Sequence, residues 1–535
     1  MVKRLVVLAS VLFVIIGFTS GMAQAMPAHP ALERQLKKEH RWDALMEELS
    51  RLREAGGIDR PAKVRRSGFP VKRVPGPLGI GLFTSGESYS ASAASPVLPA
   101  AETLVIMVDF SDKPGVLDRE GFEELFFGTG SGTARDYFSK NSCGTFLLTG
   151  NVSGGPEGGQ QTVWLRMPQN LAYYANNNYG IGGYPQNSQK LAEDAVNLLK
   201  AAGFDWTPYR AADGTVPYLC ILHAGQGAEV TGQRSDLWSC SWNLSQPVTV
   251  DTSAGQATIS DFILIPEEGV DPGVRTTIGV FCHEFGHALG LPDLYDTSER
   301  TEGGVGDWSL MASGAWLGAG HDGSVPASLD AFSRSFFNWV VPETPSTGGA
   351  GVSVAPAATS AFVYGLYPGG DTSETEYFLV ENRQHLDYDT YLPGEGLLIW
   401  RVDAAVMNPG SSYWQYNQVN NLQVRPYPGL QVVEADNDWE MVAVGGGNRG
   451  EAEDPFPGTA GNTSFTPFSA PDSNRRDGTP TAISLYRINT DGDNVGCDLS
   501  MAMVSLVPST ITAGYPGPLR VAVYGSGTHW LSAAP

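Results

Sequence analysis

Apolar runs and amphipathic stretches alternate along residues 100–345, where the secondary-structure signals are clearest. A continuous apolar run closed by turn residues predicts a buried strand, and apolar positions at helical spacing predict a helix. The strand-type runs lie at residues 102–112, 218–227 and 257–267. The helix-type runs lie at residues 133–146, 188–203 (with Ser188 as the expected N-cap) and 276–290. Interspersed strands and helices predict an α+β domain over residues 100–345.

The pattern changes after Trp339. Short apolar segments now alternate with turns rich in Gly, Pro, Asn and Asp, and convincing helical periodicity is absent. Strands are expected at residues 375–384, 394–403, 430–436 and 493–507. This pattern predicts an all-β, sandwich-like domain over residues 346–505. Residues 506–535 are expected to begin a further β domain or to form a C-terminal tail, because two strands alone are not stable.

Residues 1–25 have the features of a secretory signal peptide. Lys3 and Arg4 precede an apolar run, and Ala23–Ala25 offers small residues for cleavage. The alternative is an uncleaved membrane anchor, but the run is shorter than the ~20 residues that span a bilayer. We therefore expect a secreted, extracellular protein with no stable membrane insertion after signal cleavage.

Residues 26–99 are expected to form a pro-segment and linker. Residues 26–75 contain twelve Lys or Arg against seven Asp or Glu, whereas the whole chain carries a net charge of −23. Opposite charge would help this segment dock on the acidic body that follows. A helical pattern over residues 31–57 ends at a pair of glycines, and the Ser- and Ala-rich residues 85–100 are suited to a processing cut. The alternative is a solvated N-terminal helix.

Length and charge exclude some classes of protein. A chain of 535 residues is too long for one hydrophobic core, so two or three domains are expected. Nucleic-acid binding requires a basic face, and none is visible after residue 75. Carboxylates on turns suit calcium, although a solvated acidic surface is the alternative. The acidic positions considered are Asp387, Asp389, Asp436, Asp438, Glu451, Glu453 and Asp454.

Five cysteines are present, at positions 143, 220, 240, 282 and 497. Secretion permits disulfides, and an odd number leaves at least one thiol unpaired within the chain. Cys220 and Cys240 form a plausible pair. Cys282 is expected to be a small buried residue on the helix at 276–290.

The chemistry is concentrated in the stretch VFCHEFGHALGLPDLYD, residues 280–296. His283 and His287 lie one turn apart on the predicted helix, so both imidazoles can reach one zinc ion. Glu284 lies beside that face and is expected to accept a proton from the attacking water without binding the metal.

A catalytic zinc takes three protein ligands, so a third one is needed. Gly290 can adopt a left-handed conformation and end the helix sharply, which lets Asp293 turn back towards the metal. The pattern HExxHxxGxxD thus has aspartate where metzincins have histidine. The alternative is that Asp293 caps the turn and that Asp296 or His321 is the ligand.

Two further positions follow from this motif. Met311, within GVGDWSLMASG, is expected to form a methionine turn beneath the metal, although a plain core methionine is the alternative. Tyr295 is a weak candidate for oxyanion stabilisation. His223 ends a predicted strand and is expected to be a structural histidine.

The zinc motif and GVGDWSLMASG together resemble the immune inhibitor A-like family of secreted bacterial metallopeptidases. The resemblance continues through LVIMVDFSD, ARDYFSKNSCGTF, VPASLDAFSRSFFNWV and LPGEGLLIWRVD, and it covers roughly residues 100–500. It implies a zincin-type catalytic domain, zinc-dependent endopeptidase activity, an inhibitory pro-segment and structural calcium. Because the pro-segment contains no cysteine, inhibition of the zinc by a cysteine is excluded.

These observations predict a secreted zinc endopeptidase that acts on proteins or peptides, with His283, His287 and Asp293 as ligands and Glu284 as general base. One alternative is a catalytically inactive adhesion or binding protein on a zincin scaffold. Another is a zinc hydrolase that acts on non-peptide substrates. Substrate preference and oligomeric state cannot be predicted from the sequence.

Overall fold

The computed structural model describes residues 24–56, 100–154, 164–298, 300–301, 303–345, 349–445, 447–501, 503–507 and 520–524. Most of the predicted signal peptide and the region of the expected processing cut lie outside these residues. Within them, no helix is long and apolar enough to cross a membrane.

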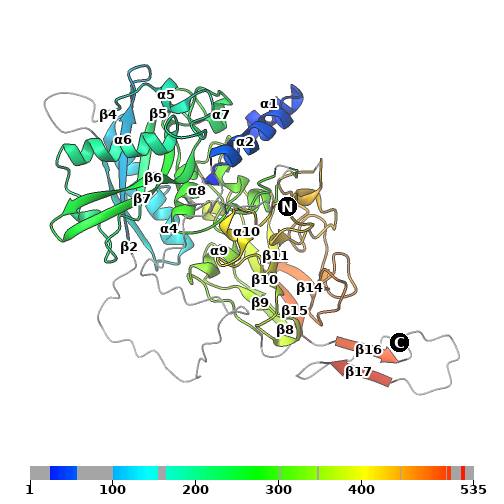
Figure 1. Cartoon of the computed structure of the whole chain (residues 1–535). Helices are drawn as coiled ribbons and strands as arrows, with labels where there is room; N and C mark the ends of the chain where they lie inside the picture. The colour runs from blue at the N-terminus through cyan, green and yellow to red at the C-terminus, as the bar shows by residue number, and fades with distance from the viewer. Residues whose placement is uncertain are drawn as a thin grey trace, which may run out of the picture.

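A seven-stranded mixed sheet forms the framework of the first domain (Figure 1). Its strands lie in the order β1-β6-β7-β5-β2-β3, and β4 pairs with β2. Strands β3, β2, β5 and β7 are parallel to one another, whereas β6 is antiparallel to β7, and β1 is antiparallel to β6. The strands are β1 (Gln24–Ala25), β2 (Ala100–Asp109), β3 (Leu147–Ser153), β4 (Leu165–Arg166), β5 (Leu219–Gln226), β6 (Cys240–Thr252) and β7 (Gly255–Glu268).

The three strands predicted for this domain are confirmed as β2, β5 and β7. Interior strands of a parallel sheet are buried on both faces and therefore read as continuous apolar runs. Strand β6 was not predicted, because its polar C-terminal half lacks such a run. The expectation of mixed strands and helices is thus confirmed.

Helices pack on the sheet, and one of them carries the HExxH motif of residues 283–287. The predicted helices are confirmed as α4, α6 and α8. The N-cap of α6 is Asn187, whose side chain accepts a hydrogen bond from the Lys190 amide, so the prediction of Ser188 as N-cap is wrong. The helices of this domain are α3 (Arg119–Phe127), α4 (Ala134–Asn141), α5 (Leu171–Ala175), α6 (Ser188–Ala201), α7 (Ala228–Thr231), α8 (Ile278–Ala288) and α9 (Ala331–Phe336).

The segment expected to be a pro-segment packs on this domain. It forms α1 (Pro30–Lys38) and α2 (Trp42–Gly56), which lie beside α7 in Figure 1. The helical pattern predicted for residues 31–57 is therefore confirmed, but as two helices, because the chain breaks at His40, which has a φ of 55°. Strand β1, just before α1, extends the sheet at the edge of β6.

Two four-stranded antiparallel sheets follow, in the orders β12-β11-β10-β9 and β13-β14-β15-β8. The predicted strands are confirmed as β10, β11, β12 and β15, although the run at 493–507 divides into β15 and β16. Strands β16 and β17 form a separate antiparallel pair. The elements are β8 (Gly349–Val354), β9 (Tyr364–Leu366), β10 (Glu376–Arg383), β11 (Gly396–Asp403), α10 (Ser412–Gln415), β12 (Leu430–Val432), β13 (Ser464–Phe465), β14 (Ser484–Asp491), β15 (Asn494–Ser500), β16 (Met503–Val507) and β17 (Arg520–Tyr524).

Strand β10 contributes to two hydrophobic cores at once. Phe378 and Val380 belong to the core shared by the two four-stranded sheets. Tyr377 and Leu379 belong to the large core of the first domain. Because successive residues of a strand point to opposite faces, one strand joins both cores. The two parts of the chain are therefore packed together as one body.

All five cysteines are free thiols, so the pairing of Cys220 with Cys240 is not formed. Cys220 lies on β5 and is paired in register with Ile263 of β7, and Cys240 lies on β6 opposite Leu264 of the same strand. Strand β7 thus separates the two cysteines, and strands within a sheet lie about 4.8 Å apart. Two strand spacings exceed the reach of a disulfide.

Candidate metal centre

Helix α8 presents both histidines of the motif to one point. His283 and His287 lie one helical turn apart and are completely buried. The Nδ1 atom of His283 hydrogen-bonds the Leu310 carbonyl at 2.8 Å, and that of His287 the Leu291 carbonyl at 2.9 Å. These bonds place the proton on Nδ1, so each Nε2 presents its lone pair to a metal.

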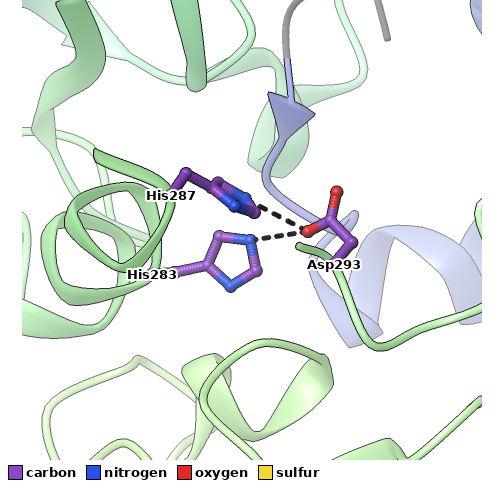
Figure 2. Close-up of side chains that lie close together, drawn as sticks. All are labelled: His283, His287 and Asp293. Carbon is purple, nitrogen blue, oxygen red and sulfur yellow. Dashed lines mark hydrogen bonds and ion pairs between the residues drawn. The ribbon is translucent and has the colours of Figure 1, made fainter. Parts of the chain in front are cut away.

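The chain turns back after α8, as predicted from Gly290. This glycine has a φ of 108°, which a side chain would rarely tolerate. The turn brings Asp293 to the histidines, with its Oδ1 atom 3.1 Å from Nε2 of His283 and 3.2 Å from Nε2 of His287 (Figure 2). Three ligand atoms from these residues lie within 4.8 Å of one another.

The protonation states of these groups suit a metal. Burial lowers the pKa of His283, so its imidazole is neutral at physiological pH. Burial would raise the pKa of Asp293, but the two imidazoles outweigh it and hold that pKa below its ordinary value. The Nε2 atom of His287 is buried without a hydrogen-bond partner. Two imidazoles and one carboxylate are a ligand set that zinc accepts, so the residues present fit a zinc ion.

Glu284 lies next to this group but outside it. It is completely buried, and neither carboxylate oxygen makes a hydrogen bond to any described residue. Burial raises its pKa well above the ordinary value, and the negative charges of Asp293 and Glu229 add to this. A buried carboxylate left without partners costs free energy in the fold, which points to a role in chemistry.

Met311 packs against helix α8 at Gly286. It is completely buried between two short 3₁₀ helices, Gly306–Trp308 and Ser313–Trp316. A Cβ atom added at Gly286 would lie 2.5 Å from the Met311 sulfur. A glycine between the two histidines therefore lets the methionine pack directly against the helix.

The N-terminal segment passes beside the site, as the faint blue ribbon in Figure 2 shows. Met26 is completely buried, and its carbonyl accepts a hydrogen bond from the Trp238 indole at 2.7 Å. The Pro27 carbonyl accepts one from Trp316 at 3.0 Å. The Met26 main chain also lies close enough to Glu284 to oppose the rise in its pKa.

The alternative third ligands lie elsewhere. Asp296 accepts hydrogen bonds from the amide and hydroxyl of Ser298 and from the Leu422 amide. The carbonyl of His321 contacts the ring of His29 at 2.7 Å. Tyr295 lines a small cavity that also touches Pro27. His223 is buried, and burial lowers its pKa to about 4, in keeping with a neutral structural histidine.

One contact with the site was not predicted. Asn417, from the loop after α10, hydrogen-bonds both the amide and the carboxylate of Asp293. The two residues are 124 positions apart. No spacing rule connects them, and only the fold brings them together.

A second group of carboxylates lies beyond β12. Oxygens of Glu434, Asp436 and Asp454 lie within 4.8 Å of one another. Burial, together with the charge of Asp454, raises the pKa of Glu434 to about 8, and burial raises that of Asp454 to about 6. By contrast, the other acidic pair singled out in the sequence is engaged in ion pairs, because Asp389 binds Arg383 and Asp387 binds Lys140.

Known proteins share this site-bearing region. Residues 101–341 match the immune inhibitor A peptidase M6 catalytic domain. This region of the chain is therefore similar to the catalytic domain of the immune inhibitor A family. Immune inhibitor A of Bacillus thuringiensis subsp. alesti is 26% identical over 290 residues, which are 44% of this chain and 39% of that protein. The pre-pro-metalloprotease PrtV of Vibrio cholerae serotype O1 is 28% identical over 229 residues, which are 38% of this chain and 23% of that protein. The matches thus span less than half the length of these relatives, and they confirm the predicted resemblance to this metallopeptidase family.

Proposed function

We propose that this chain is a secreted zinc-dependent endopeptidase with a zincin-type catalytic domain and a following β-sandwich-like domain. The observation that carries the proposal is the meeting of His283, His287 and Asp293 in a buried site of an immune inhibitor A-type domain. The unpartnered Glu284 beside them supports a hydrolytic role. Met311 would be the methionine turn of this site.

The mechanism divides the work among a few residues. Zinc held by His283, His287 and Asp293 would supply Lewis acidity and lower the pKa of a water molecule. Glu284 accepts the proton of the attacking water and then delivers it to the leaving amine. The fixed Nδ1 hydrogen bonds of the two histidines keep their rings in place throughout.

Hydrolysis of unfolded casein tests this function. The matured, zinc-loaded chain should cleave casein, a chelator should stop cleavage, and added zinc should restore it. A hydrolase of non-peptide substrates would leave casein intact but cleave small esters or amides. An inactive binding protein would cleave neither.

We further propose that the N-terminal segment keeps the enzyme latent until it is removed. The burial of Met26 beside Glu284 supports this, because substrate and Met26 would compete for the same space. Glu33 of α1 also forms an ion pair with Arg449 of the second domain. The N-terminal segment thus contacts the first domain through Met26 and the second domain through Glu33.

N-terminal sequencing of the secreted protein checks the latency proposal. We expect the active species to begin near residue 95 and a species that begins at Met26 to be inactive. Glu33→Ala should speed activation, because it removes one contact of the segment. Glu39→Ala is the matched control, since Glu39 is exposed and its partner Arg41 lies within the segment. A fully active enzyme that begins at Met26 would refute latency.

We also propose that Glu434, Asp436 and Asp454 bind structural calcium. Their crowding supports this, because like charges at short range need a cation. The raised pKa of Glu434 means that the folded chain holds more protons than the unfolded chain. Without calcium, stability should therefore fall as pH rises from about 4.5, the ordinary value, to about 8.

Melting temperatures at pH 5 and pH 8, with and without calcium, test this site. Calcium should raise the melting temperature mainly at pH 8, and Asp454→Asn should remove most of that response. Asp438→Asn is the control, because Asp438 lies on the same turn but outside the cluster. An equal calcium response in wild type and Asp454→Asn would contradict the proposed ligands.

A further inference from the structure

Asn417 makes a two-point contact with Asp293 from outside the matched catalytic region. Its Oδ1 atom accepts a hydrogen bond from the Asp293 amide at 2.8 Å. Its Nδ2 atom donates one to Oδ2 of Asp293 at 2.5 Å. Asn417 is 2% exposed, so bulk water does not compete for either bond.

This contact gives the two oxygens of Asp293 different roles. Oδ1 faces the Nε2 atoms of His283 and His287, whereas Oδ2 accepts a hydrogen bond from the Asn417 side chain. A main-chain amide can only donate and an ionised carboxylate can only accept, so the partner must offer one acceptor and one donor. An Asn side chain offers both. Aspartate would lose the donor and add a like charge.

The loop that carries Asn417 is held firmly. The main-chain amide of Asn417 donates a hydrogen bond to the Trp414 carbonyl at 3.0 Å, and the main-chain carbonyl of Asn417 accepts one from the Thr297 hydroxyl at 3.1 Å. Trp414 is completely buried and packs against Phe336 of α9, with ring centroids 5.1 Å apart. The backbone of Asn417 has a φ of 53°, a conformation in which Asn is among the best tolerated residues.

We propose that Asn417 is a positioning residue of the metal centre, which holds Asp293 so that Oδ1 is left free for the metal. The proposal rests on the zinc site proposed above. It also means that the catalytic site is completed by the second domain. Outer partners of this kind are worth about 10–100-fold in metal affinity or activity.

Two substitutions, made in the full-length chain and measured after its maturation, test this role. Asn417→Asp keeps the shape but removes the donor, and Asn417→Gly removes the amide without straining the backbone. We expect zinc affinity, measured by competition with a chelating dye, to fall about 10–100-fold in both. The visible absorption of the cobalt-substituted protein should change, and kcat at saturating zinc should fall more than KM changes.

Asn421→Ala is the matched control. Asn421 lies on the same loop and donates to the Thr297 hydroxyl at 3.1 Å, but it does not touch Asp293. It should lower the melting temperature of the metal-free protein while leaving zinc affinity and the cobalt spectrum unchanged. Wild-type zinc affinity in both Asn417 variants, or an equal loss in Asn421→Ala, would overturn the inference. If the wild-type chain binds no zinc, the proposed function fails instead.

Discussion

Glu284→Gln is expected to lower casein hydrolysis by at least about 10²–10⁴-fold, the usual contribution of a general base, while zinc remains bound. Glutamine keeps the size of the side chain but cannot accept a proton from water. Glu284 is not among the three side chains whose ligand atoms converge, so the metal site should survive. The measurement is the casein rate beside zinc stoichiometry.

Glu267→Gln provides the control for losing a buried carboxylate. Glu267 is also completely buried, but it accepts hydrogen bonds from main-chain amides of Val116, Leu117 and Gly225. This variant should lose stability and keep the catalytic rate of its folded fraction. Near-normal casein turnover by Glu284→Gln would remove Glu284 from the mechanism.

Asp293→Ala should abolish zinc binding and activity together. Two imidazoles alone hold zinc poorly, because a catalytic site normally supplies three protein ligands. The loss should exceed the ~10–100-fold typical of an outer partner, and therefore exceed the effect of Asn417→Asp. Zinc content after dialysis against a mild chelator, compared with the peptidase rate, measures both effects.

Asp296→Ala is the matched control for this substitution. Asp296 lies three residues further along the same turn and fixes Ser298 and Leu422 without reaching the histidines. It should loosen the turn but keep most of the zinc. Asp293→His tests whether an imidazole can replace the carboxylate. Full zinc and full rate in Asp293→Ala would show that the third ligand lies elsewhere.

The parts of the site that are close in sequence were predictable. Helical spacing places His283 and His287 on one face, and Gly290 allows the return of Asp293, all within eleven residues. The contacts of Met26 and Asn417 join segments more than a hundred positions apart, so no local pattern could indicate them.

The same distinction applies to the fold. Buried strands such as β5 were predictable, because burial on both faces leaves a continuous apolar run. Strand β6, which pairs antiparallel with β7, lacks that run. The break at His40 was missed because the flanking residues keep helical spacing. A Cys220–Cys240 disulfide could be excluded only once the order of the strands in the sheet was known.

Strand β10 contributes side chains to both hydrophobic cores, and this determines where the chain could be cut into separately folding parts. A chain that stopped at residue 341, where the family match ends, would leave Tyr377, Leu379 and Trp414 out of the large core. It would also lose Asn417 and the ion pair of Arg449 with the N-terminal segment. The boundary of sequence similarity is therefore not a boundary of folding. Replacing the β region with an unrelated one would require rebuilding both the large core and the support of Asp293, the proposed third ligand.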